Sequence, residues 1–319
     1  MSCTYHPKSA LRSGSRVGLA LLLTLAASAG ASAQERDSDK LTSAEVLAQT
    51  TADDWRDVSA ENLLIMTVAG YEIVIELAPT FAPQHIENLR TLVTQGYFDG
   101  LAIVRSQDNY VVQWGDPAAT PEQARSLGAA KERLDGEYEQ VSRDIEMTSL
   151  DAVDAYADKV GFVDGFPVAA DRRHTWLTHC YAMVGVGRGN EADSGNASSL
   201  YVVTGHAPRH LDRNVTLIGR VLDNVEGLSS MPRGSGPLGF YESPDQPIRI
   251  DSIVLASSLP EDERPRWQRL RTDTPTFTAL VESRRTRHEE WFLNEVGRIG
   301  LCNVPLPARR APATAEDDE

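Results

Sequence analysis

Short, mostly apolar runs bounded by turn residues recur along the chain, and within 71–77 apolar and polar positions alternate with a period of two, as in a strand that buries one face. Residues 63–68 and 71–77 form the first pair of runs, on either side of an Ala-Gly turn. Residues 101–104 and 110–112 flank the polar turn 106–109, and residues 248–255 alternate again. These runs predict antiparallel strands joined by short turns.

A spacing of three and four residues predicts helices elsewhere. Ile86, Leu89 and Val93 share one helical face, Pro83 suits the first turn of that helix, and Gly96 suits its end. A capping box at 42–45 predicts a short helix after it. We expect further helices over residues 121–134, 147–159, 261–271 and 276–296, and a loop over 161–170.

A polar residue follows each of the apolar runs 101–104 and 110–112. Arg105 closes the run 101–104, and Gln113 closes the run 110–112. A guanidinium beside a buried strand is unfavourable unless it meets a partner or a substrate. The other interpretation is an Arg at a strand edge whose head reaches water, and these residues alone leave both open.

A series of short motifs resembles the cyclophilin family in order and spacing. The first half of the chain carries Glu76-Leu77, Ala82-Pro83, Gly96-Tyr97-Phe98-Asp99-Gly100, Val104-Arg105 and Gln113-Trp114-Gly115-Asp116. The second half carries Tyr181-Ala182-Met183-Val184, Ser199-Leu200-Tyr201-Val202-Val203 and the run 211–221. The resemblance implies a mainly β fold over residues 62–257, a closed antiparallel β-barrel with a helix over each open end. A partly helical insertion at about 118–178 interrupts it.

The same resemblance implies peptidyl-prolyl cis–trans isomerisation, with Arg105 as the catalytic residue and Gln113 as the residue that holds it. The implied substrate-binding residues are Tyr110, Val111, Val184, Leu200, Val202, His210, Leu211 and Val215. The chain departs from the family's pattern at five positions in or next to this site: Val104 replaces a His, Leu200 a Gln, Gly185 an Asn or Arg, His210 a Trp, and Val215 a His or Tyr. We therefore expect a weak isomerase or one with an unusual substrate. The alternative is a catalytically inactive module that binds peptides through the same barrel.

Composition and charge narrow the choice of partner. The chain has 319 residues, 41% of them hydrophobic, and a formal charge of −15. This charge disfavours nucleic acids and anionic membranes. We expect a monomer that binds proline-containing segments of client proteins and needs no cofactor. His206 and His210 have the spacing of metal ligands on a helix, but Pro208 between them favours a loop, so no metal is expected.

The N-terminal segment suggests export. Residues 1–33 combine the basic residues Lys8, Arg12 and Arg16, an apolar stretch and a small-residue cleavage pattern, as in a signal peptide. The mature protein is then periplasmic or secreted, with no stable membrane insertion. Cys180 and Cys302 remain after cleavage, either as a disulfide or as two buried thiols. We expect a helical arm at 34–61, a helical extension at 258–304 and a disordered tail at 305–319.

Overall fold

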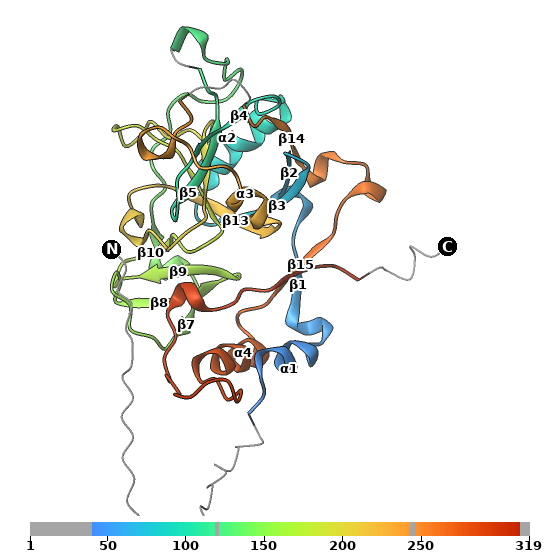
Figure 1. The fold of residues 1–319 in the computed structure, drawn as a ribbon, viewed down its shortest axis with the longest axis vertical. Coiled ribbons are helices and arrows are strands. Elements are labelled where there is room, and N and C mark those ends of the chain that lie inside the picture. Colours follow the sequence, from blue (N-terminus) through green and yellow to red (C-terminus); the bar gives the residue numbers. More distant parts are fainter. Residues whose placement is uncertain (1–39, 119–120, 243–246, 313–319) are drawn as a thin grey trace, which may run out of the picture. The chain divides into compact units, whose positions relative to one another are not determined.

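The computed structural model describes residues 40–118, 121–242 and 247–312 (Figure 1). The predicted signal peptide therefore lies outside the described residues. The α-helices of the described part are α1 (Ser43–Ala48), α2 (Pro83–Thr94), α3 (Val225–Ser229) and α4 (Pro275–Arg285). The first strands are β1 (Trp55–Asp57), β2 (Leu63–Val68), β3 (Tyr71–Leu77), β4 (Ala102–Ser106), β5 (Val111–Gly115), β6 (Gln140–Val141), β7 (Thr148–Leu150) and β8 (Lys159–Val163). The remaining strands are β9 (Phe166–Ala170), β10 (His174–Leu177), β11 (Met183–Val186), β12 (Leu200–Val203), β13 (Leu217–Asp223), β14 (Ile250–Leu255), β15 (Trp267–Leu270) and β16 (Ala308–Arg310).

Eight of these strands form the expected antiparallel barrel, which confirms the mainly β class. Their order is β14-β2-β3-β13-β11-β12-β5-β4. A bridge between Ala102 and Arg249 joins the two outer strands. Beside it, the amide of Ile103 donates to the carbonyl of Ile248 over 2.9 Å. These bonds close the sheet into a barrel, so its edge strands are paired.

Side chains from alternate strand positions fill the barrel, as period-two burial requires. The interior cluster includes Met66, Ile73, Ile75, Val112, Trp114, Val184, Leu200, Val202 and Ile218. Helix α2 packs against β14, and α3 packs against β3. The Ala82 at the start of α2 supplies no side-chain cap. Glu137 from the insertion accepts hydrogen bonds there from the amides of Gln84 (3.0 Å) and His85 (2.9 Å).

The insertion contains more strand and less helix than the sequence predicts. The α-helix expected over 121–134 is wrong: the segment contains only the short 3₁₀ turn Pro121–Gln123, and side chains of α2 and of Gln95 just after it hold the rest in an irregular conformation. The Asn88 amide oxygen accepts from the amide of Lys131 (2.7 Å), and the Gln95 side chain donates to the carbonyl of Leu127 (2.6 Å). The helix expected over 147–159 is also wrong, because strand β7 lies in it.

The loop expected over 161–170 is a β-hairpin, built from β8 and β9. Its two turn residues, Asp164 and Gly165, both have positive φ angles, 48° and 80°. Two-residue hairpin turns of this kind favour Asp-Gly because glycine tolerates the left-handed region. The hairpin belongs to a five-stranded sheet of order β6-β10-β9-β8-β7.

The C-terminal extension is only partly helical. The helix expected over 261–271 is wrong, because β15 pairs there with β1 on one side and β16 on the other. The helix expected over 276–296 ends at Arg285 as α4. The tail expected from 305 contains strand β16, and residues 313–319 lie outside the described part. Pairing with two partner strands accounts for β15, since it satisfies backbone groups that a helix would otherwise satisfy.

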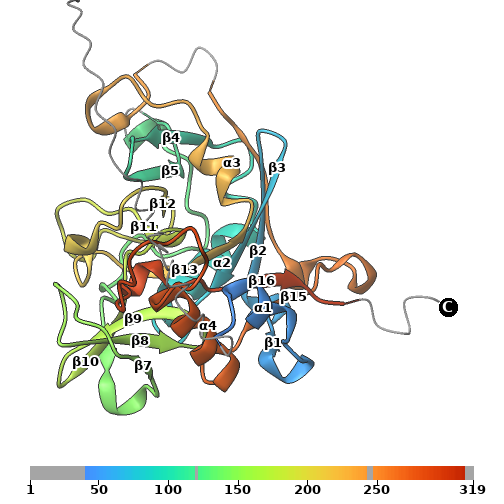
Figure 2. The same cartoon turned by 60° about the horizontal axis from the view of Figure 1, so that its bottom comes forward.

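Several contacts fasten the additions to the barrel. Cys180 and Cys302 form a disulfide, with their sulfur atoms 2.02 Å apart. Glu76 of the barrel accepts from Arg56 and Arg269 of the small sheet, both at 2.6 Å. Helices α1 and α4 lie side by side in both views (Figure 1 and Figure 2). Among the described residues, no helix has the length and apolar character needed to cross a membrane.

Candidate active site

Arg105 lies on β4 directly after a β-bulge. The pairing of β4 with β5 sets Ile103 opposite Trp114 and Arg105 opposite Gln113, so Val104 is the extra residue. A bulge bends its strand and redirects the neighbouring side chains. The carbonyl of Val104 accepts from the amide of Tyr241 over 3.1 Å. This position, where the family has a His, is therefore fixed by backbone pairing with a later loop.

The guanidinium of Arg105 is held by aromatic rings and by one carbonyl. Its Nε donates to the carbonyl of Leu238 over 2.7 Å, and its Nη2 donates to the side chain of Gln107. The rings of Tyr110 and Phe240 lie 5.4 Å and 5.3 Å from it, which is within cation–π range. Burial lowers the pKa of Arg105. Its Nη1 has no hydrogen-bond partner in the part of the chain that the structure describes, so it is available to a substrate.

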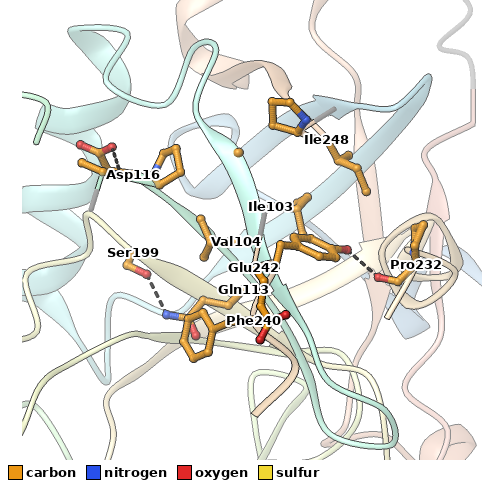
Figure 3. Close-up of a pocket in the computed structure, with 14 residues that line it drawn as sticks. Ile103, Val104, Gln113, Asp116, Ser199, Pro232, Phe240, Glu242 and Ile248 are labelled. Carbon is orange, nitrogen blue, oxygen red and sulfur yellow. Dashed lines mark hydrogen bonds between the residues drawn. The ribbon is translucent and has the colours of Figure 1, made fainter. Parts of the chain in front are cut away.

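Gln113 does not hold Arg105, contrary to the sequence-based expectation. The two residues pair across β4 and β5, but the Gln113 side chain turns toward the other neighbour, β12. There its Nε2 donates to the Ser199 hydroxyl over 3.0 Å (Figure 3). In place of the contact with Gln113 that the resemblance implied, Arg105 donates hydrogen bonds to the Leu238 carbonyl and the Gln107 side chain.

The outer face of β5 and β12 carries an apolar cluster beside Arg105. Val111, Tyr201 and Val203 are its buried members, and Tyr110 and Val215 are partly buried against them. The expected groove residues Val184, Leu200 and Val202 point instead into the barrel interior. The expectation that these three residues face the groove is wrong. Tyr201, and not Leu200, pairs with Gln113, so Tyr201 lies on the outer face and its neighbours Leu200 and Val202 lie on the inner one. A shift of one residue exchanges the two faces of a strand.

His210 and Leu211 lie in a short 3₁₀ turn, Arg209–Leu211, next to this cluster. The His210 ring stacks on the Tyr110 ring, with centroids 6.4 Å apart and planes 5° from parallel. Leu211 is half-buried in the same turn. Tyr110 therefore lies between the guanidinium of Arg105 and the imidazole of His210, where the resemblance implied a pocket wall.

A buried polar network, which no sequence motif indicated, lies beneath the apolar cluster. His179 Nε2 lies 2.7 Å from the Tyr201 hydroxyl, and His179 Nδ1 lies 2.9 Å from Asp212. Burial lowers the pKa of His179 and raises the pKa of Tyr201. The neutral imidazole therefore donates from Nδ1 to the carboxylate and accepts at Nε2 from the phenol. This network fixes the ring of Tyr201 on the outer face.

Gly185 makes room for that ring. A Cβ atom built on Gly185 would lie 2.4 Å from the Cζ of Tyr201, which is too close for any other residue without a shift of the ring. Gly185 is one of the positions where the chain departs from the family's pattern. The departure is thus the signal in the sequence that could have indicated Tyr201.

A cavity of about 630 Å³ lies beside β4 (Figure 3). Its lining includes the apolar side chains of Ile103, Val104, Phe240 and Ile248 and the polar side chains of Gln113 and Glu242. Phe240 both lines the cavity and contacts Arg105. The sequence-based interpretation missed segment 238–242; its aromatic pair within a Gly- and Pro-rich stretch was the available signal. In the described ranges, no three His, Cys, Asp or Glu side chains are grouped as metal ligands.

The fold and the site together define a class: an antiparallel eight-stranded barrel that presents a fixed arginine beside an outer apolar face. The family model for cyclophilin type peptidyl-prolyl cis-trans isomerases matches residues 63–255, and the chain belongs to this family.

Individual relatives agree with this assignment. Peptidyl-prolyl cis-trans isomerase-like 1 of Gibberella zeae is 36% identical over 205 residues, which cover 64% of this chain and 98% of that protein. Peptidyl-prolyl cis-trans isomerase-like 2 of the same organism is 26% identical over 186 residues, or 58% of this chain, and the chain spans only 25% of its length.

One solved structure is similar over more of the chain than the family segment. The crystal structure of cyclophilin AquaCyp293 from Hirschia baltica matches with a TM-score of 0.64 and 26% identity, covering 85% of this chain and 97% of that one. The likeness therefore includes parts of the additions outside residues 63–255.

Proposed function

We propose that the chain catalyses the cis–trans rotation of X-Pro peptide bonds in client proteins, with Arg105 as the catalytic residue. The uncatalysed barrier is about 18–20 kcal/mol because rotation destroys amide resonance. In the twisted transition state the proline nitrogen gains a lone pair that a hydrogen-bond donor stabilises. Since the donor must be in place beforehand, a fixed guanidinium is suited to the task.

One observation carries this proposal: the guanidinium of Arg105 is fixed on one edge, while its Nη1 has no partner among the residues that the structure describes. Leu238, Tyr110 and Phe240 hold it beside the apolar cluster. Its side-chain entropy is therefore lost on folding and not during the reaction, which favours transition-state binding.

The proline ring would contact the exposed part of the cluster. Val111, Tyr201 and Val203 are only 2%, 6% and 0% exposed, so they supply a floor more than a deep pocket. Tyr110, His210 and Val215 are the members that a ligand can reach. A shallow site of this kind agrees with the weak turnover that the sequence predicts.

We also propose that the protein is exported. Residues 1–33 have the pattern of a cleaved signal peptide. The disulfide between Cys180 and Cys302 supports the same conclusion, because such bonds persist in oxidising compartments. Its clients would then be folding or mature proteins of the periplasm or the exterior.

A protease-coupled assay on a proline-containing peptide tests the activity. Arg105→Ala should lower kcat/KM by about 10²–10³-fold, the usual effect of removing one preorganised donor. Arg105→Lys keeps the charge but loses the planar fork, so it should also be impaired. If wild type and Arg105→Ala turned over equally, the arginine mechanism would be wrong. If neither turned over, the alternative of a peptide-binding module without catalysis would replace it.

A further inference from the structure

The cavity beside β4 is large enough for part of a peptide in addition to the proline. Its volume of about 630 Å³ lies within the range of roughly 300–1,000 Å³ that is usual for ligand pockets. It adjoins the catalytic arginine, because Phe240 forms its wall and Gln113, opposite Arg105 in the ladder, forms its floor. The apolar face described above is a separate surface, on the side of Tyr110.

Most polar groups in the cavity already have partners. The Gln113 amide donates to Ser199, and the Tyr241 hydroxyl donates to the carbonyl of Pro232 over 2.5 Å. The Asp116 carboxylate accepts from the backbone amides of Ala118 (2.9 Å) and Arg125 (2.5 Å). These groups shape the cavity and leave little capacity for a ligand.

The polar groups that remain are acceptors. The Gln113 Oε1 atom and the exposed carboxylate of Glu242 have no hydrogen-bond or ion-pair partner among the described residues. Of the described residues that line the cavity, none is Lys, Arg or His. The chain as a whole is also acidic, with a formal charge of −15. A ligand that fits must therefore be apolar along most of its length and must end in donors.

We propose that this cavity is a subsite for a lysine or arginine side chain of the client segment. The methylene stem packs on Ile103, Val104 and Ile248, and the cationic end reaches the carboxylate of Glu242. This subsite rests on the proposed prolyl isomerase function. An extended peptide advances about 3.3–3.6 Å per residue, so the basic residue lies within a few positions of the proline.

The test compares two proline peptides that differ only in lysine and its uncharged isostere norleucine. The substituted position is moved through two places before and three places after the proline. The measured quantity is the ratio of kcat/KM for the two peptides. At one position wild type should prefer lysine by about two- to fivefold, as expected for a solvent-exposed ion pair. A ratio of one at every position would overturn the proposal.

Two variants identify the group responsible. Glu242→Gln should bring the ratio to one, and Glu242→Lys should reverse the preference toward a glutamate peptide. Glu87→Gln removes one charge from an exposed residue of α2 that does not line the cavity, and it should keep the wild-type ratio. An unchanged ratio in Glu242→Gln would assign the preference to another group and overturn the site.

Failure of the subsite can be separated from failure of catalysis. If no peptide is turned over, the proposed function fails, but binding of the labelled lysine and norleucine peptides still measures the preference by fluorescence anisotropy. Tighter binding of the lysine peptide to wild type than to Glu242→Gln would support the subsite. Equal binding of both peptides would refute it.

Discussion

Arg105 is placed by residues that follow it by more than 130 positions. The carbonyl of Leu238 and the ring of Phe240 come from a loop that the motifs of the family do not include. Gly239 locks this loop onto β4: its φ is 78°, and a Cβ there would lie 2.6 Å from the Cα of Gln107. The sequence therefore indicated the arginine that we propose as the catalytic residue, but not the groups that fix it.

Phe240→Leu should lower kcat more than it raises KM. The ring's cation–π contact with Arg105 is worth about 0.5–2 kcal/mol, so kcat should fall roughly two- to thirtyfold while substrate binding changes little. Steady-state kinetics of the protease-coupled reaction measures both constants. In the Arg105→Ala background the same substitution should have almost no further effect on kcat. Additive losses in the double variant would show that Phe240 acts independently of Arg105.

The choice of strand face also depends on single residues. The resemblance of Ser199-Leu200-Tyr201-Val202-Val203 to the family implied that Leu200 and Val202 face the groove, but in the structure Tyr201 pairs with Gln113 and takes that face. Both Leu200 and Tyr201 are apolar enough to be buried, so the hydrophobic pattern alone could not decide between them. This is why Val184, Leu200 and Val202 were expected in the groove and lie in the core.

Local sequence patterns were sufficient to predict those helices and strands whose conformation depends mainly on neighbouring residues. Strands β2 and β3 are mostly apolar runs on either side of an Ala-Gly turn, and α2 has a continuous apolar face with Pro83 at its first turn. Residues 121–134 show the same helical spacing, yet bonds from Asn88 and Gln95 hold them in another conformation. The hairpin of β8 and β9 was predictable from Asp164-Gly165 between apolar runs, and the Gly- and Pro-rich composition obscured it.

Helix α2 should depend on the distant carboxylate of Glu137. Burial opposes ionisation of Glu137, but hydrogen bonds from His85 and from two helix amides leave its pKa below the ordinary value of 4.5. The stabilisation is therefore fully present above about pH 4.5 and is lost as the pH falls through the lower folded-state pKa. Glu137→Gln should cost about 1–2 kcal/mol at pH 7, the usual effect of a lost cap, and much less at pH 3.

Urea unfolding at the two pH values measures this difference. Glu87→Gln, an exposed carboxylate on the same helix, is the matched control and should have little effect at either pH. An equal loss for Glu137→Gln at pH 7 and pH 3 would mean that the carboxylate charge does not stabilise the helix start.

For the whole molecule, the family motifs predicted the barrel and its closure, while the additions were predicted only in part. The short strands β1, β15 and β16 pair across long sequence separations. Such strands are stabilised by partners that no local window of sequence contains, and β15 was therefore mistaken for a helix. The buried ion pairs of Glu76 with Arg56 and Arg269 then join this small sheet to the barrel.

The disulfide should contribute substantially to global stability. It joins residues 122 positions apart and so restricts the unfolded chain over a long loop. Replacing both Cys180 and Cys302 with Ala should lower the free energy of unfolding by about 2–4 kcal/mol. Urea denaturation of the oxidised wild type and of the double variant measures the change. An unchanged free energy of unfolding would show that the bridge does not restrict the unfolded state effectively.

Exchange NMR on a proline-containing peptide tests the central claim most directly, because it observes rotation of the bond without a coupled protease. The uncatalysed exchange takes tens of seconds or longer. With catalytic amounts of wild type, cross-peaks between the cis and trans forms should appear within a mixing time of about a second, and Arg105→Ala should abolish them. Cross-peaks of equal intensity with both proteins, or none with wild type, would contradict the account.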